Sequence, residues 1–384
     1  MAASSARAFL RRSLATLTRV PLQPVTYTPE GAVAISYPIL QSSPLSLQTS
    51  IEKAFGSDPK ALGIIVVKDL PSGFTAKRDR LLRLADRFAS LPESAKEKYV
   101  DSNSKYSFGW SHGKASLFTF ALVIKDPLFI DTLKGSYYAN PLVDNPDSSP
   151  QDRQSHPEYY GKNIWPAPDE AGVEGFEEAF KDLGRFVYKV GCEMATACQP
   201  FASQHLSDRS VSLSDLISKQ TAKARLLHYF PPDPQTPLPT EDEPIDSWCG
   251  FHLDHSILTG LCSAMYLSHE SNQAPKVVAS PSPQSGLYIR SRGGGLTKVS
   301  IPADCLAFQT GEALELATGG KLRATPHCVR VGASSRVGQI SRETFALFMQ
   351  PEMYQLVGPD ETFGQFSKRI FNEHYQDNLV AAAA

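Results

Sequence analysis

A histidine and an aspartate two positions apart are the first candidates for chemistry in this chain. His252 and Asp254 flank Leu253, and His327 lies far downstream. On an extended strand, residues i and i+2 project from the same face, so His252 and Asp254 can bind one metal ion together. His327 would be the third ligand. Two imidazoles and one carboxylate leave three positions open on an octahedral ion, as in non-haem Fe(II) oxygenases, so the spacing predicts an iron site.

An arginine farther along the chain predicts an anionic ligand near the same metal. Arg342 precedes the apolar stretch 345–349, which has the composition of a buried strand. An unpaired guanidinium inside a barrel is costly, because neither water nor an anion compensates its charge. We therefore expect an anion to bind Arg342, and a dicarboxylate cosubstrate would provide one.

Several further blocks occur in a characteristic order between residues 35 and 355. They are 35–38, 63–67, 226–232, 252–260, 286–290 and 311–315. The last four are similar to the NYYPP, H-x-D…LT, GLQV and GD-x-LE motifs of one family. Together the blocks resemble the 2-oxoglutarate and Fe(II)-dependent dioxygenases, in particular the branch of isopenicillin N synthase and clavaminate synthase.

The resemblance implies roles for individual residues. His252, Asp254 and His327 would be the catalytic iron ligands. Arg342 and Thr344 would take the place of the family's R-x-S pair, which holds the far carboxylate of 2-oxoglutarate. This role fits their chemistry, because a guanidinium binds a carboxylate through two parallel bonds and a hydroxyl two residues along the strand points to the same side.

The chain also departs from the family pattern. The interval from His327 to Arg342 is longer than usual, and the glycines within 332–338 predict an extended hairpin loop. Arg336 in this loop is a rival anchor, although Val337-Gly338 after it supplies neither a hydroxyl nor an apolar strand.

A further departure lies in the block that resembles NYYPP. His228 and Phe230 stand where the family has the Asn and the second Tyr that often touch the cosubstrate. This departure concerns the geometry of the cosubstrate and not the metal.

The activity that the resemblance implies is oxidation of a small organic substrate, with hydroxylation as the default outcome. Fe(II), 2-oxoglutarate as cosubstrate and O₂ would be required, and succinate and CO₂ released. Desaturation and cyclisation remain open, because they depend on how the substrate is positioned. Two alternatives are a 2-oxoglutarate-independent oxidase of the isopenicillin N synthase type and a non-catalytic binding protein on the same fold.

Length and composition agree with one compact catalytic unit. The chain has 384 residues, 41% of them hydrophobic, which is enough to form a substantial core. The net charge is −2 and no basic run carries interleaved aromatics, so we expect no nucleic-acid partner. No apolar stretch is long enough to span a bilayer, and we expect a soluble protein. The oligomeric state stays open.

The beginning of the chain is basic. It contains four arginines before residue 20 and no acidic residue before Glu30. This composition resembles an organellar presequence and predicts a mitochondrial location, with the cytoplasm as the alternative. We expect four regions: the basic segment 1–30, a mixed and helical region 31–220, the Fe(II)/2-oxoglutarate core 221–355, and a C-terminal helix and tail 356–384.

The spacing of apolar residues predicts the elements that must position the site. Helical periodicity covers 74–99 and 173–198. From residue 224 onward, short apolar runs alternate with glycine and proline clusters, which favours a jelly roll. The predicted strands are 225–230, 261–267, 287–290, 297–301, 305–309, 323–331 and 343–349. The expected fold is mainly β with flanking helices (α+β), around a cupin-like double-stranded β-helix.

Overall fold

The computed structural model describes residues 21–113, 133–231, 249–270, 273–330, 339–370 and 372. The first twenty residues of the basic segment, Arg336 with the loop around it, and the tail after residue 372 lie outside the described residues.

Two β-sheets face each other within the described part of the chain. The larger has eleven strands and the smaller has four. The main path of the large sheet runs β1 (Thr26–Tyr27), β2 (Val33–Ser36), β3 (Ile64–Lys68), β13 (Leu306–Thr310), β8 (Leu258–Cys262), β15 (Ile340–Met349), β6 (Lys223–Tyr229), β5 (Lys134–Ala139) and β4 (Gly109–His112). Beside this path, β9 (Met265–Ser268) pairs with β15 and with β10 (Lys276–Val278). The small sheet runs β12 (Leu296–Val299), β11 (Gly286–Arg290), β14 (His327–Arg330) and β7 (Cys249–His252).

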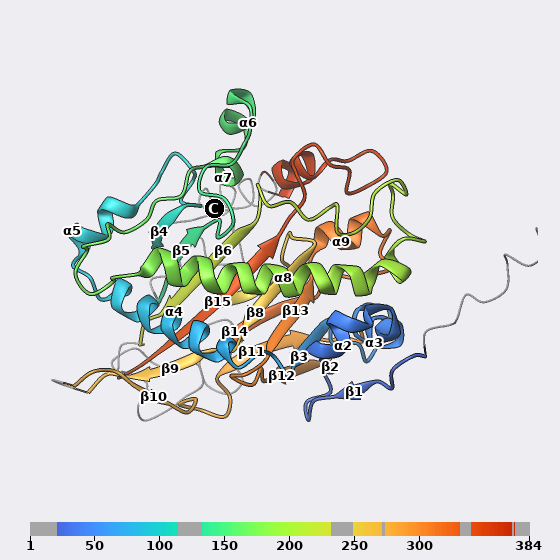
Figure 1. Cartoon of the computed structure of the whole chain (residues 1–384), viewed down its shortest axis with the longest axis horizontal. Coiled ribbons are helices and arrows are strands. Elements are labelled where there is room, and N and C mark those ends of the chain that lie inside the picture. The colour runs from blue at the N-terminus through green and yellow to red at the C-terminus, as the bar shows by residue number, and fades with distance from the viewer. Residues whose placement is uncertain are drawn as a thin grey trace, which may run out of the picture.

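Two long helices cover the outer face of the large sheet. Figure 1 shows α4 (Gly73–Ala89) and α8 (Phe176–Ala202) crossing this face, with the small sheet on the other side. The apolar stripes of both helices are buried against the sheet and each other. The shorter helices are α2 (Tyr37–Ser42), α3 (Gln48–Phe55), α5 (Glu93–Lys96), α6 (Pro150–Ser155), α7 (Pro157–Tyr160) and α9 (Glu312–Ala317), with 3₁₀ turns η1 (Pro44–Leu47) and η2 (Glu97–Tyr99). Among the described residues, no helix is both long and apolar enough to cross a membrane.

The central strands of the large sheet are buried on both faces. All of β6 and nearly all of β15 are buried. The two strands pair in antiparallel register, with Arg342 opposite Tyr229 and Glu343 opposite His228. Because side chains alternate along a strand, Arg342 and Tyr229 face the small sheet, whereas Glu343 and His228 face the helices.

Several predicted elements end or divide differently in the structure. The helix predicted over 74–99 stops at Ala89, close to Pro92, which disfavours the helical conformation in the residue before it. The strand predicted over 261–267 divides into β8 and β9. The buried Arg78 of α4 donates hydrogen bonds to the carbonyls of Ser263 and Ala264, so these carbonyls leave the sheet ladder. The strand predicted from residue 323 begins only at His327, after a proline without an N–H.

The contact between α8 and β8 depends on a glycine. A Cβ on Gly260 would lie 2.5 Å from Cγ1 of Val187 on α8 and 3.1 Å from Cε1 of Phe308 on β13. Both neighbouring side chains are fully buried, so neither can move into solvent. The helix can approach the sheet this closely only because the position carries no side chain.

We expect Gly260→Ala to lower the free energy of unfolding by about 1–3 kcal/mol, the usual cost of overpacking a core. Urea denaturation followed by circular dichroism would measure the change. Gly73→Ala is the matched control, because nothing lies within 4 Å of a Cβ built there. Wild-type stability for Gly260→Ala would contradict the close packing of α8 on β8.

Candidate active site

The three predicted metal ligands come together on neighbouring strands of the small sheet. His252 ends β7 and His327 begins β14, and the two residues are paired in register. Their ring centroids are 4.2 Å apart. Asp254 follows β7, and its Oδ1 lies 3.8 Å from Nε2 of His252 and 3.9 Å from Nε2 of His327. One ligand atom from each residue therefore lies within 4.8 Å of the others.

His327 is held in the form that binds metals. Its Nδ1 lies 3.0 Å from the carbonyl oxygen of Thr325 and donates a hydrogen bond to it. The proton is then on Nδ1, and the lone pair of Nε2 faces Asp254 and His252. Burial, together with the adjacent His252, lowers the pKa of His327 to about 4. The imidazole is therefore neutral near pH 7, as a metal ligand must be.

The carboxylate of Asp254 requires a cation. Asp254 is only 7% exposed, and its Oδ2 has no hydrogen-bond partner among the described residues. A buried ionised carboxylate oxygen without a partner is strongly unfavourable. The neutral imidazole of His327 cannot balance its charge. The donor set thus fits a divalent metal ion of the Fe(II) type.

The block that resembles the GD-x-LE motif positions both metal-binding segments. Gly311 packs against the segment that follows Asp254, where an added Cβ would lie 2.1 Å from the carbonyl oxygen of Ser256. The next amide, that of Glu312, donates to the carbonyl of Asp254 at 2.7 Å. On α9, the carboxylate of Glu315 accepts a hydrogen bond from the amide of Ala324 at 2.7 Å, three residues before His327. These contacts were not foreseen from the sequence, which showed only the motif.

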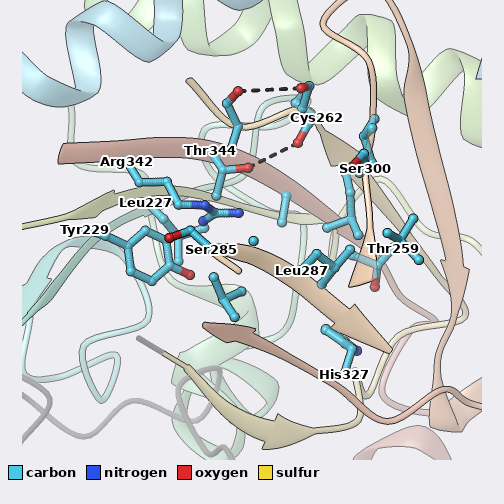
Figure 2. A pocket seen from close by; sticks show the side chains of 18 of the residues that line it. Leu227, Tyr229, Thr259, Cys262, Ser285, Leu287, Ser300, His327, Arg342 and Thr344 are labelled. Carbon is cyan, nitrogen blue, oxygen red and sulfur yellow. Dashed lines mark hydrogen bonds between the residues drawn. The ribbon is translucent and has the colours of Figure 1, made fainter. Parts of the chain in front are cut away.

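Arg342 points into a cavity between the two sheets (Figure 2). The residue is 5% exposed, and its Nε and Nη1 have no hydrogen-bond partner within the described part of the chain. The guanidinium carbon lies 4.9 Å from the ring centre of Tyr229, which holds it by a cation–π contact. A buried guanidinium with free N–H groups fits an anionic ligand, as the sequence led us to expect.

The cavity joins this arginine to the metal ligands. Its volume is about 250 Å³, and its walls include His252, Asp254, His327, Arg342 and Thr344. All five predicted site residues therefore line one space. The Thr344 hydroxyl donates to the carbonyl of Cys262 at 3.2 Å, and its oxygen can still accept.

Two residues of the block that resembles NYYPP face away from the cavity. His228 lies on the helix side of β6, where its Nδ1 is 2.9 Å from Oε2 of Glu343. Phe230 packs its ring against His228 and His112, at centroid distances of 4.4 and 4.7 Å. Because side chains alternate along the chain here, residues 228 and 230 share the face opposite to Tyr229. Tyr229 lines the cavity instead, and the alternation around this block could have identified it.

Solved structures show the same fold across most of the chain. A Caulobacter crescentus protein described as a member of the 2OG-Fe(II) oxygenase family matches 89% of this chain and 99% of its own, with 18% identity and a TM-score of 0.60. A full-length Neurospora crassa protein, solved in complex with alpha-KG and thymine, matches 91% of this chain and 100% of its own, with 16% identity and a TM-score of 0.58. JOX2, solved with 2OG, Fe and JA, matches 94% of this chain and 92% of its own, with 14% identity and a TM-score of 0.54.

At the level of sequence, no protein-family model and no curated protein matches the chain. The likeness is therefore one of three-dimensional structure. It covers most of the chain, and the predicted double-stranded β-helix core with flanking helices is confirmed. The chain has the fold of the 2OG-Fe(II) oxygenases.

Proposed function

We propose that the protein is an Fe(II)- and 2-oxoglutarate-dependent dioxygenase. It would oxidise a small organic substrate, with hydroxylation as the default outcome, and release succinate and CO₂. One observation carries the proposal. Among the described residues, Oδ2 of the buried carboxylate of Asp254 and two nitrogens of the buried guanidinium of Arg342 have no hydrogen-bond partner, and both side chains line the same cavity. A metal ion chelated by a dicarboxylate would satisfy both at once.

The residues of this chain would divide the work as follows. His252, Asp254 and His327 would hold the iron, and the hydrogen bond to Thr325 would keep Nε2 of His327 directed at it. Arg342 would bind the far carboxylate of 2-oxoglutarate and so set its orientation. When bound, Fe(II) supplies the open positions at which 2-oxoglutarate and O₂ react. Two complexes support this cosubstrate, since the Neurospora crassa protein was solved with alpha-KG and JOX2 with 2OG and Fe.

The remainder of the cavity wall would exclude water from the reaction. Apolar side chains of both sheets line it, including Leu227, Leu261 and Leu287. Removing water strengthens the electrostatic contacts of Arg342 and Asp254 and protects reactive species from side reactions.

The 2-oxoglutarate-independent oxidase is the alternative on this fold. Such an enzyme has no need of a buried cation for a cosubstrate carboxylate. Nε and Nη1 of Arg342, which have no hydrogen-bond partner among the described residues, therefore favour the 2-oxoglutarate-dependent reaction. A non-catalytic binding protein would not need two imidazoles beside an uncompensated buried carboxylate, so the same geometry disfavours it.

Removing a metal ligand should abolish tight iron binding and turnover. Loss of a residue that hydrogen-bonds a metal ligand weakens metal binding by up to about 100-fold. Loss of a ligand itself should cost at least as much, so we expect Asp254→Ala or His252→Ala to weaken Fe(II) binding at the site by at least about 100-fold. Anaerobic titration calorimetry would measure binding, and succinate release would measure turnover. The fold should stay intact, because these side chains line a cavity.

Asp304→Asn serves as the matched control, since Asp304 is exposed and does not line the cavity. It should bind iron like the wild type. If the Ala variants at 252 and 254 retain full iron binding and succinate release, the proposed iron site is wrong.

Removing the guanidinium should weaken the cosubstrate and leave the metal in place. For Arg342→Met we expect half-saturation by 2-oxoglutarate at a concentration roughly 10- to 100-fold higher, the equivalent of one charge-assisted hydrogen bond or more. Iron affinity should change little. Arg185→Met on the exposed face of α8 is the control. Unchanged 2-oxoglutarate dependence in Arg342→Met would mean that another group holds the carboxylate.

A further inference from the structure

A second set of metal-binding side chains lies behind the strand that carries Arg342. Asp86 on α4, His228 on β6 and Glu343 on β15 each place one potential ligand atom within 4.8 Å of the others. All three residues are buried, with exposed fractions of 4%, 4% and 0%. The three elements are far apart in the sequence, so the packing of α4 on the sheet is what brings these atoms together.

The contacts form a continuous chain of polar atoms. Nδ1 of His228 lies 2.9 Å from Oε2 of Glu343, and the hydroxyl of Ser341 donates to Oε1 of Glu343 at 2.7 Å. His269, which follows β9, continues the chain. Its Nε2 lies 3.0 Å from the Ser341 oxygen and 3.2 Å from Oδ1 of Asp86.

The charges in this cluster do not balance without added protons or a cation. Asp86 and Glu343 are both carboxylates, and within the described residues neither forms an ion pair with a lysine or arginine. Oδ1 of Asp86 accepts no hydrogen bond there, and His269 is its one ion-pair partner. Burial raises the pKa of Asp86, and the negative charge of Glu343 raises it further. The repulsion between the two carboxylates is thus only partly compensated by the imidazoles.

Two arrangements could restore the balance. In the first, each histidine takes up a proton and pairs with one carboxylate. In the second, both histidines are neutral and one divalent ion neutralises both carboxylates. The three ligand atoms lie within 4.8 Å of one another, and Oδ1 of Asp86 accepts no hydrogen bond from the described residues, which favours the ion.

An ion could also reach the cluster. The side chain of His269 is 33% exposed, whereas that of Asp86 beside it is 5% exposed. His269 therefore connects the buried oxygen and nitrogen atoms with solvent. A proposed metal site needs such an entry path as well as a suitable set of ligands.

We propose that Asp86, His228 and Glu343 bind a divalent first-row metal ion of the zinc type, with His269 as the partner of Asp86 on the solvent side. One imidazole and two carboxylates, with a water molecule in the fourth position, form a tetrahedral set that suits zinc. The ion would join α4, β6 and β15 directly behind Arg342 and stabilise the strand that carries it. The inference does not depend on the function proposed above.

Cobalt(II) offers a direct test, because four-coordinate Co²⁺ absorbs visible light far more strongly than six-coordinate Co²⁺. The experiment uses metal-free full-length protein in which His252→Ala and Asp254→Ala remove the first site. We expect it to bind one equivalent of Co²⁺ with intense visible bands that Zn²⁺ abolishes. Adding Asp86→Asn or Glu343→Gln, both nearly isosteric, should remove these bands.

Controls separate loss of the site from loss of the fold. Asp304→Asn, at an exposed aspartate outside the cluster, should leave Co²⁺ binding unchanged in the same background. His269→Gln, at the partly exposed edge, should keep the fold by circular dichroism and weaken Co²⁺ binding about tenfold or more. A folded background protein that binds no Co²⁺ would overturn the proposal and assign two protons to the cluster. Binding that survives both Asp86→Asn and Glu343→Gln would place the ion elsewhere and overturn it equally.

Discussion

Strand β15 borders the polar cavity on one face and packs against the helices on the other. The site therefore depends on the register in which β15 pairs with its neighbouring strands. Arg342 and Thr344 face the cavity, whereas Glu343 and Phe345 face the helices. Because side chains alternate, a slip of one residue would bury Arg342 against α4 and turn Glu343 into the cavity. Pairing with β6, β8 and β9 prevents this slip. The edge-to-face contact of Phe345 with Phe180 on α8 adds a side-chain constraint.

The cavity between the sheets is built around two opposite charges that the described residues leave unsatisfied. At one side the carboxylate of Asp254 lies between two imidazoles, and at the other the guanidinium of Arg342 stacks on Tyr229. Neither charge can be neutralised by the other across a space that both line. Leaving both uncompensated lowers stability, so the arrangement is that of a receptor for a cation and an anion bound together. The scaffold tolerates this cost because α8 and the sheet form a large core elsewhere.

The sequence predicted the residues proposed to bind the metal and the cosubstrate, but not those that position these residues. The spacing of His252 and Asp254 predicts a shared metal ion, and the apolar strand after Arg342 predicts an anionic ligand for its guanidinium. The structure brings these residues to one cavity. The bracing of both metal-binding segments by Gly311 and Glu315 depends on contacts across the fold, which no local pattern encodes. The division between β8 and β9 likewise arises from a distant arginine on α4.

The proposed dioxygenase activity depends most directly on whether 2-oxoglutarate chelates iron in this cavity. A 2-oxo acid bound to Fe(II) through its keto and carboxylate oxygens produces a weak visible metal-to-ligand charge-transfer band. We expect this band to appear when 2-oxoglutarate is added anaerobically to the Fe(II)-loaded wild-type protein. Its intensity should saturate when one 2-oxoglutarate is bound per iron. Bound iron without any such band would contradict the proposed 2-oxoglutarate-dependent activity. It would favour an oxidase that draws its electrons from the substrate alone.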